Sequence, residues 1–139
     1  MSSPEAVRIP CVGGIVHDDA GRLLLVRRGT PPAQGTWSVP GGRVEAGESG
    51  PEATAREVQE ETGLVVVVGR LVGTVERAAP AGGVYVIDDY LCVAASGADL
   101  GAVRGGDDAA DARWFTAKEV RALDTAPGLV EALTGWGVL

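Results

Sequence analysis

The sequence predicts an α/β fold, a sandwich in which helices cover both faces of a central mixed sheet. Three observations support this prediction. Strand-like apolar runs flank one well-bounded helix, further strands follow it, and helices end the chain. The length of 139 residues allows a core of useful size, and no repeat or linker divides the chain. We therefore expect residues 1–139 to form a single domain.

Two strands are expected first. Residues 7–16 are apolar and β-branched, with Pro10 indicating an edge position or an early bulge. Residues 22–28 form the second run, after turn residues at 18–21. Because the turn is short, we expect the two strands to pair as a hairpin. His17, the single histidine, precedes this turn and is expected to be exposed.

The helix between Ser49 and Gly63 is the most clearly bounded element. Ser49 and Glu52 have the spacing of a capping box, and Pro51 suits the first turn. Gly63 suits the left-handed position that ends many helices. Before this helix, residues 29–35 contain adjacent prolines and predict a loop. The side expected to pack on the core carries Ala55, Val58 and Thr62.

Strands and then helices are expected after Gly63. Residues 64–75 are rich in valine and predict a buried strand that bends near Gly69 or Gly73. After a loop at 78–83, residues 84–95 predict a long strand that Asp88 and Asp89 interrupt.

The chain is expected to end in a short strand and two helices. The strand covers residues 112–115, and Thr116 with Glu119 predicts a capped helix directly after it. A last helix is expected over residues 128–133, with Trp136 docking on the body of the protein.

The charge and the cysteines limit the classes of partner. The formal net charge is −7, and residues 42–64 carry six acidic and two basic residues. This sign gives little attraction to nucleic acid or to an anionic membrane, so we expect neither as a partner. Cys11 and Cys92 lie in apolar runs without C-x-x-C spacing, which predicts buried free thiols. With no signal peptide and no apolar run near about 18 residues, a cytoplasmic protein is expected.

Three carboxylates share one face of the central helix. Glu57, Glu60 and Glu61 fall within an arc of roughly 100° on that face. Like charges at this spacing repel each other by a few tenths of a kcal/mol per pair. A divalent cation would offset the repulsion, since Mg²⁺ takes oxygen ligands. The alternative, read from these three residues alone, is a solvated acidic face.

A longer pattern includes these carboxylates. Its named positions are Gly42, Glu48, Arg56, Glu57, Val58, Glu60, Glu61, Gly63 and Leu64. The pattern resembles the signature box of the Nudix hydrolases, G-x5-E-x7-R-E-U-x-E-E-x-G-U with U apolar, and it matches without a departure. The box covers 23 of 139 residues, and the segment 37–42 before it also looks like the family. The resemblance implies a Nudix-type α/β/α sandwich that cleaves phosphoanhydrides.

The resemblance also implies roles in binding metal. Glu57 and Glu61 match metal ligands, with Mg²⁺ expected and Mn²⁺ as a substitute. Glu60 matches either a ligand or the general base, and the sequence leaves both roles open. A backbone carbonyl of Gly41 is expected to join the metal shell. The alternative is that Gly41 and Gly42 serve only the turn.

Other residues of the box are expected to assist. Arg56 pairs with a neighbouring carboxylate and orients Glu57, which places it with Glu60 and Glu61 in the catalytic machinery. Glu48 and Gly42 are supporting residues, with Glu48 bonding within its loop or reaching the metal through water.

Substrate contacts are expected outside the box. Arg27 or Arg28 binds a phosphate, and strand alternation allows at most one of them to do so. The alternative is that both belong to a solvated strand end. Trp37 stacks on a base or belongs to the core. Asp111 lies near the site or on a surface loop.

Substrate class is predicted from two features. Pro80, downstream of the box, and the run from Arg27 to Trp37 look like the ADP-ribose pyrophosphatase branch of the family. We therefore expect hydrolysis of ADP-ribose or a related nucleotide sugar. The alternatives are a MutT-like nucleoside triphosphate pyrophosphohydrolase and a non-catalytic nucleotide-sugar sensor. A homodimer is also expected from the resemblance and from edge strands.

Overall fold

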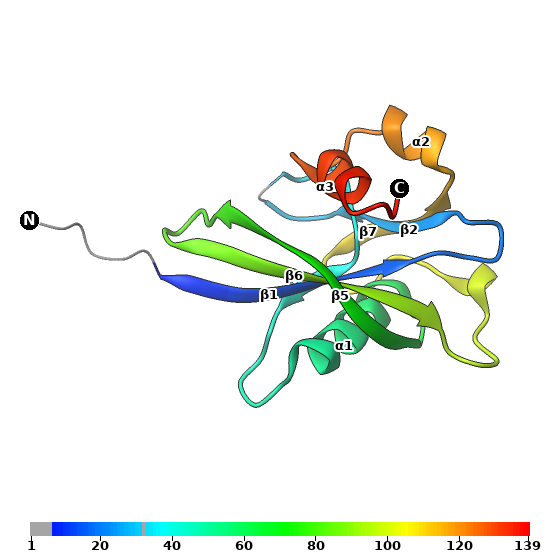
Figure 1. The fold of residues 1–139 in the computed structure, drawn as a ribbon, viewed down its shortest axis with the longest axis horizontal. Coiled ribbons are helices and arrows are strands. Elements are labelled where there is room, and N and C mark those ends of the chain that lie inside the picture. Colours follow the sequence, from blue (N-terminus) through cyan, green and yellow to red (C-terminus); the bar gives the residue numbers. More distant parts are fainter. Residues whose placement is uncertain (1–6, 32) are drawn as a thin grey trace, which may run out of the picture.

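The strands of the computed structural model form two sheets (Figure 1). The structure describes residues 7–31 and 33–139. Its strands are β1 (Arg8–Val16), β2 (Leu23–Arg28), β3 (Trp37–Ser38), β4 (Gly41–Arg43), β5 (Val66–Ala78), β6 (Val84–Ala94) and β7 (Ala109–Phe115). Its helices are α1 (Gly50–Thr62), α2 (Ala117–Ala122) and α3 (Leu129–Gly135), with a 3-10 turn at Leu100–Ala102. One sheet has the order β4-β1-β6-β5 and the other has the order β3-β2-β7.

Helices lie on both sides of these sheets. Figure 1 shows α1 on one side and α2 with α3 on the other. In the four-stranded sheet β1 pairs in parallel with β6, whereas the other pairs are antiparallel, so the sheet is mixed. The predicted fold class, an α/β sandwich with a mixed sheet, is confirmed. No helix in the described ranges is long and apolar enough to cross a membrane.

The predicted hairpin of the first two strands is wrong. β1 and β2 enter different sheets, and one isolated bridge between His17 and Leu23 joins them beside the turn. The turn itself is as expected, with Asp18 Oδ1 accepting from the backbone N–H of Ala20 and Arg22. Both strands are buried at consecutive positions. Each therefore needs cover on both faces, which a two-stranded hairpin does not provide.

The predicted edge position of the first strand is also wrong, because β1 lies between β4 and β6. Pro10 is tolerated there for a local reason. Its carbonyl accepts from Val44 N–H on the β4 side, and the nitrogen of a strand residue points the same way as its carbonyl. The ladder with β4 covers only Cys11 to Gly13. The missing N–H of Pro10 therefore interrupts neither ladder.

The end of the chain docks on the body of the protein. Trp136 packs, as predicted, against the hydrophobic core that contains Ile15 and Leu23. Its ring lies over the backbone of Gly73. His17, which was expected to be exposed, is half-buried instead. Its Nε2 lies 3.0 Å from the carbonyl oxygen of Val138. The C-terminal segment covers this histidine, a long-range contact that local sequence does not encode.

Helix α1 begins and ends where its signals predict. The Ser49 side chain accepts from Glu52 N–H, the Glu52 carboxylate accepts from Ser49 N–H, and Gly63 ends the helix with a φ of 78°. Pro51 lies in the first turn. The buried face consists of Ala53, Thr54, Val58 and Thr62, with Ala55 half-buried. This face packs on β1, β4 and β5.

The valine-rich strand β5 is an edge strand, so the prediction that it is buried is wrong. Val66 is buried, but Val67 is 59% exposed and Leu71 is 47% exposed. The predicted bend is confirmed, because the pairing with β6 shifts register between Val68 and Gly73. Its alternating half-buried and exposed residues are typical of a strand that has one covered face.

The acidic pair of β6 does not interrupt that strand. Asp88 accepts a hydrogen bond of 2.7 Å from the Thr74 hydroxyl on one face. Asp89 points to the other face and is 5% exposed. The remaining predicted elements are confirmed: the loop at 29–35 in its described residues, with Pro32 outside them, the Thr116–Glu119 capping box and the last helix. Cys11 and Cys92 are buried free thiols, also as predicted.

The two cores hold the sheets together at one end. The first core contains Ile15, Leu23 and Leu25 with residues of α2 and α3. The second contains Val16 and Leu24 beneath Val58 of α1. All these residues of β1 and β2 lie beside the turn that separates the two strands. Away from this turn, at Cys11–Gly13 and Val26–Arg28, the sheets leave a cavity between them.

Candidate active site

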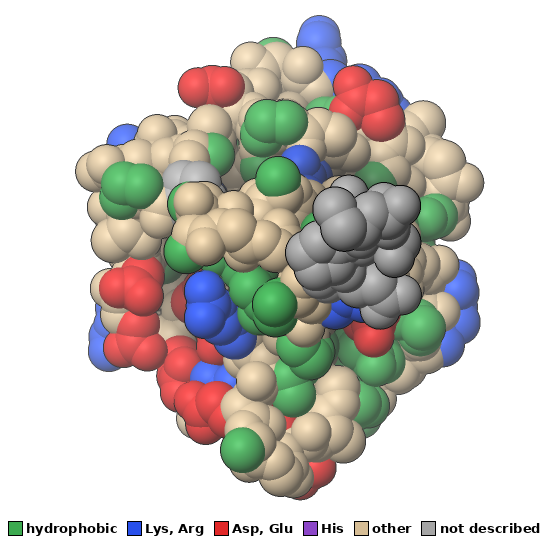
Figure 2. All heavy atoms as spheres, turned by 90° about the vertical axis from the view of Figure 1, so that its left-hand side faces the viewer, with side chains coloured by type: hydrophobic (Ala, Val, Ile, Leu, Met, Phe, Trp, Pro, Cys, Tyr) green, Lys and Arg blue, Asp and Glu red, His purple; other side chains and the backbone are tan. Residues whose placement is uncertain are grey.

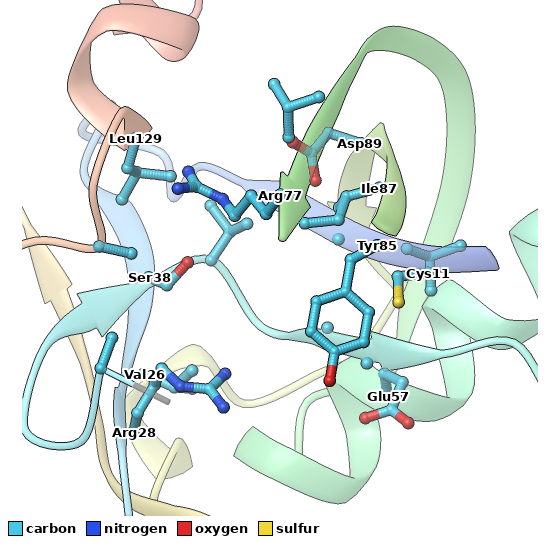
Figure 3. Close-up of a pocket in the computed structure, with 18 of the residues that line it drawn as sticks. Cys11, Val26, Arg28, Ser38, Glu57, Arg77, Tyr85, Ile87, Asp89 and Leu129 are labelled. Carbon is cyan, nitrogen blue, oxygen red and sulfur yellow. The ribbon is translucent and has the colours of Figure 1, made fainter. Parts of the chain in front are cut away.

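The cavity has a volume of about 790 Å³ and lies between the two sheets (Figure 3). One wall is formed by the four-stranded sheet, mainly by one of its faces, because most of its lining residues alternate along the strands. The alternating residues are Cys11 and Gly13 of β1, Gly41 and Arg43 of β4, Val75 and Arg77 of β5, and Tyr85, Ile87 and Asp89 of β6, and the cavity also touches Val12, Gly42, Glu76 and Ala78. Val26, Arg28, Ser38, Val39 and Leu129 face this wall. A cavity of this size suits a nucleotide-sized ligand.

Two carboxylates of α1 lie at the edge of this cavity, beside the turn into β4. Gly41 N–H donates to Glu61 Oε2 over 3.3 Å. A Cβ at Gly42 would lie 2.7 Å from the Cδ and Oε1 atoms of Glu57. A side chain at either glycine would collide with its surroundings, because a Cβ at Gly41 would overlap the carbonyl oxygen of Val12. The two glycines therefore allow the backbone of β4 to approach both glutamates closely.

Burial outweighs the nearby positive charge of Arg56 and Arg28 at these two carboxylates. Burial raises the pKa of Glu61 to about 8, and the charge of Glu57 adds to the effect. Burial also raises the pKa of Glu57, against the lowering effect of Arg56. A cation at this position would relieve both effects. The available donors are carboxylate and backbone oxygens, which are the ligands that a hard divalent ion such as Mg²⁺ prefers.

Glu60 is placed differently from its neighbours. Its side chain is 41% exposed, and its Oε2 atom lies 3.1 Å from Arg56 Nη1. It does not line the cavity with Glu57 and Glu61. In the part of the chain that the structure describes, no three acidic, histidine or cysteine side chains converge on one metal position. The structure therefore brings together two members of the predicted trio and leaves the third beside Arg56.

Arg56 connects the carboxylates of this region. It binds Glu48 through Nε and Nη2, and its Nη1 lies 2.8 Å from Glu57 Oε1. Its Nη2 also donates to the carbonyl of Arg43. The guanidinium lowers the pKa of Glu48 to about 2, aided by a hydrogen bond from Glu45 N–H. Arg56 therefore contacts one oxygen of Glu57. In the lower part of Figure 2, acidic side chains gather with basic side chains among them.

Both predicted phosphate-binding arginines, Arg27 and Arg28, line the cavity. The guanidinium of Arg28 extends into the cavity (Figure 3), and its charge lowers the pKa of Glu61. Arg27 is exposed, and its guanidinium carbon lies 5.9 Å from the centre of the Trp37 ring. Trp37 itself packs edge-on against Phe115, with 4.9 Å between the ring centroids, and does not line the cavity.

The other predicted substrate contacts lie outside the cavity. Pro80 is exposed in the turn between β5 and β6. Asp111 is half-buried on β7, where it accepts from Ala112 N–H and from Arg113 Nε, both over 2.8 Å. Asp108 and Ala109, just before it, do line the cavity. The structure therefore does not bring Pro80 or Asp111 together with the glutamates.

Several cavity residues were not predicted from the sequence, and two of them carry charge on the wall opposite Arg28. Arg77 and Asp89 both belong to the wall formed by the four-stranded sheet. Strand alternation carried the missing signal, since it places Asp88 and Asp89 on opposite faces of any strand through them. One of the two had to point inward.

A comparison with known families decides the assignment of the chain. The family model for the NUDIX domain matches residues 7–134. The chain belongs to the Nudix family. Members of this family generally use divalent metal ions, which agrees with the oxygen donors found beside Glu57 and Glu61.

Two relatives of this Nudix chain are an ADP-ribose pyrophosphatase and a MutT-like protein. It is 38% identical to an ADP-ribose pyrophosphatase of Methanocaldococcus jannaschii over 104 residues, 75% of this chain and 59% of that enzyme. It is 34% identical to a MutT-like protein of Streptomyces ambofaciens over 145 residues, 99% of this chain and 88% of that protein. The crystal structure of a MutT protein from Methanosarcina mazei matches with a TM-score of 0.81 and 25% identity, covering 97% of this chain and 96% of that one.

Proposed function

We propose that this Nudix chain hydrolyses the phosphoanhydride bond of a nucleoside diphosphate linked to another group. ADP-ribose or a related nucleotide sugar is the proposed substrate. The observation that carries the proposal is the pair of carboxylates, Glu57 and Glu61, on the rim of a cavity that Arg28 also enters. The pair suits a cation and Arg28 suits a phosphate, so a diphosphate with its metal would fit between them.

The proposed cofactor is Mg²⁺, with Mn²⁺ as a substitute. Glu57, Glu61 and the backbone carbonyl of Gly41 would hold it. When bound, such an ion neutralises charge on the diphosphate and lowers the pKa of an attacking water. Arg56 keeps Glu57 in place through the 2.8 Å contact of its Nη1. Glu60 has two roles open to it, as a third ligand or as the general base.

A panel of nucleotide substrates tests this proposal. The protein is incubated with ADP-ribose and other nucleoside diphosphate sugars in the presence of Mg²⁺, and released AMP or its analogue is measured. The expected result is metal-dependent release of a nucleoside monophosphate by wild type. Glu57→Gln and Glu61→Gln should reduce the rate by at least about 100-fold, because both remove a carboxylate from the proposed metal site. Turnover that persists in EDTA would contradict the proposal.

A second candidate reaction is pyrophosphate release from nucleoside triphosphates. The match to the Streptomyces MutT-like protein over 99% of this chain favours it as an alternative. The two reactions have different products, so the same panel separates them when nucleoside triphosphates are included and pyrophosphate is measured. The predicted homodimer and the predicted cytoplasmic location stay predictions.

A further inference from the structure

Asp89 is a buried acidic residue, and one of its two carboxyl oxygens has no hydrogen-bond partner among the described residues. It lies on β6 and is 5% exposed. Its Oδ1 atom is shut off from solvent and makes no hydrogen bond to any of residues 7–31 and 33–139. Asp89 belongs to the same face of β6 as Tyr85 and Ile87, and Figure 3 shows its side chain among those that line the cavity.

Two glycines make room for this carboxyl group. Gly13 on β1 and Gly73 on β5 are both register partners of Asp89. A Cβ at Gly13 would overlap Asp89 Oδ1, so the carboxyl group occupies the space that a side chain at Gly13 would fill. On the strand that flanks Asp89 opposite β1, the ring of Trp136 covers Gly73. Asp89 therefore lies in a slot between two strands without side chains at that level.

The environment of Asp89 does not compensate its burial. Burial raises the pKa of Asp89 to about 7, although the positive charge of Arg77 opposes that effect. Arg77 also lines the cavity, but no ion pair joins it to Asp89 in the described chain. A buried carboxyl oxygen without a hydrogen bond raises the free energy of the folded state. A ligand that donates a hydrogen bond to the Asp89 carboxyl group would offset part of this cost.

The surroundings of Asp89 favour a flat, largely apolar ligand group. Val75 and Ile87 lie on the same wall of the cavity, and Val39 and Leu129 face them. Figure 3 shows Asp89 well separated from Glu57, on a different side of the cavity. A diphosphate beside Glu57 and Glu61 would therefore leave its attached nucleoside to extend toward Asp89.

We propose that Asp89 is a specificity-determining residue that accepts a hydrogen bond from an N–H group of the nucleobase. The proposal rests on the function proposed above, because it assumes a nucleotide in this cavity. The valine, isoleucine and leucine side chains would contact the faces of the base, and Asp89 would contact its edge. A ribose hydroxyl could also donate to a carboxylate. The apolar walls favour the base, since they would leave the other hydroxyls of a sugar without partners.

Kinetics with a matched pair of substrates test this role. Wild type, Asp89→Ala and Asp89→Asn are compared on ADP-ribose and on the analogue in which unsubstituted purine replaces adenine. Purine lacks the exocyclic amine, which is the N–H donor on that edge of adenine. Asp88→Asn is the control variant, because Asp88 lies on the opposite face of β6 and bonds to Thr74.

The expected result is a rise in KM on substitution of Asp89 that occurs only when the substrate carries the exocyclic amine of adenine. Asp89→Ala should raise KM for ADP-ribose by about 10-fold or more and change kcat little, as for a lost hydrogen bond to a carboxyl group. Wild type should show a similar rise with the purine analogue, and Asp89→Ala should add nothing further. Asp89→Asn should fall between, because its amide oxygen still accepts. The control should equal wild type on both substrates.

Two outcomes would overturn the assignment. One is an Asp89→Ala variant whose KM for ADP-ribose equals that of wild type. The other is a rise in KM that Asp89→Ala shows equally with ADP-ribose and with the purine analogue, which would point to a ribose hydroxyl. If wild type turns over neither substrate, the function proposed above fails instead. Asp89 is then tested by calorimetric titration with AMP and purine riboside monophosphate in EDTA. Equal affinity of wild type and Asp89→Ala for AMP would then overturn the assignment. Thermal unfolding of both variants shows that they are folded.

Discussion

Arg56 grips Glu48 side-on, with Nε 2.7 Å from one carboxylate oxygen and Nη2 2.9 Å from the other. The remaining nitrogen, Nη1, contacts Glu57 and Glu60. One planar group therefore joins the loop before α1 to the helix face that carries the proposed metal ligands. A lysine cannot reproduce this arrangement, because its ammonium group is a single donor centre.

Arg56→Lys should lower kcat/KM for ADP-ribose by about 10- to 100-fold, as expected for a residue that orients a metal ligand. The reason is the loss of the contact that fixes Glu57. Steady-state kinetics at saturating Mg²⁺ measure the effect. Arg22→Lys is the matched control, because Arg22 binds Asp18 at a turn away from the cavity. Equal activity of both variants would show that the arginine network does not support the reaction.

Gly42→Ala should reduce metal-dependent activity while the protein stays folded. The backbone at Gly42 has no positive φ, so alanine is allowed there. Its Cβ would nevertheless come within 2.7 Å of the Glu57 carboxyl group, which must move. The variant should require a higher Mg²⁺ concentration for half-maximal rate. Gly135→Ala is the control, since nothing lies within 4 Å of its added Cβ. An unchanged Mg²⁺ requirement would contradict the placement of Glu57 at the metal.

The metal-free protein should lose stability as the pH rises from about 5 to 8. The pKa of Glu61 is raised to about 8 in the folded protein, above its ordinary value of 4.5. The folded state therefore binds the proton more tightly, and this stabilisation is lost as the pH approaches 8. Asp89, with a pKa of about 7, acts in the same direction. Glu48, with a pKa lowered to about 2, acts only below pH 4.5.

Scanning calorimetry in EDTA measures this effect. Glu61→Gln should show a smaller fall in Tm over the same pH range and a higher Tm than wild type at pH 8, because glutamine has no charge to bury. Parallel curves for the two proteins would show that Glu61 is not buried in its charged form.

Addition of Mg²⁺ should raise the Tm of wild type at pH 8. A ligand at about 100 times its Kd stabilises the folded state by about 2.7 kcal/mol. The shift should be much smaller in Glu57→Gln and Glu61→Gln, and also in wild type at pH 5, where Glu61 is protonated. Calorimetry at several Mg²⁺ concentrations gives the dependence. An equal shift in all these samples would place the bound metal elsewhere on the protein.

The locally encoded parts of this fold were predictable from the sequence. The limits of α1 follow from Ser49, Glu52 and Gly63, which act within one turn of the helix, and the structure reproduces them. Pairing between distant strands was not predictable in this way. Pro10 indicated an edge strand, whereas β4 pairs with β1 only at Cys11–Gly13, after the proline. The sequence does not show where this pairing begins.

The same limit applies to the candidate site. The box glutamates lie on one helix, so their spacing alone placed Glu57 beside Glu61. The inward position of Asp89 depends on its register with Gly13 and Gly73, on strands far away in the chain. Trp37 is a residue that could have been a substrate contact and instead packs on Phe115. Phe115 lies far away in the sequence, so no local pattern predicts this contact.

The parallel pairing of β1 with β6 has a consequence for how the protein reaches its native state. It joins Arg8 to Val84, and β1 is central in its sheet. During synthesis, β1 emerges before β6 and has no parallel neighbour until β6 has also left the ribosome. Pairings of this range are slow to form, and the consecutive apolar residues of β1 stay open to aggregation in the meantime.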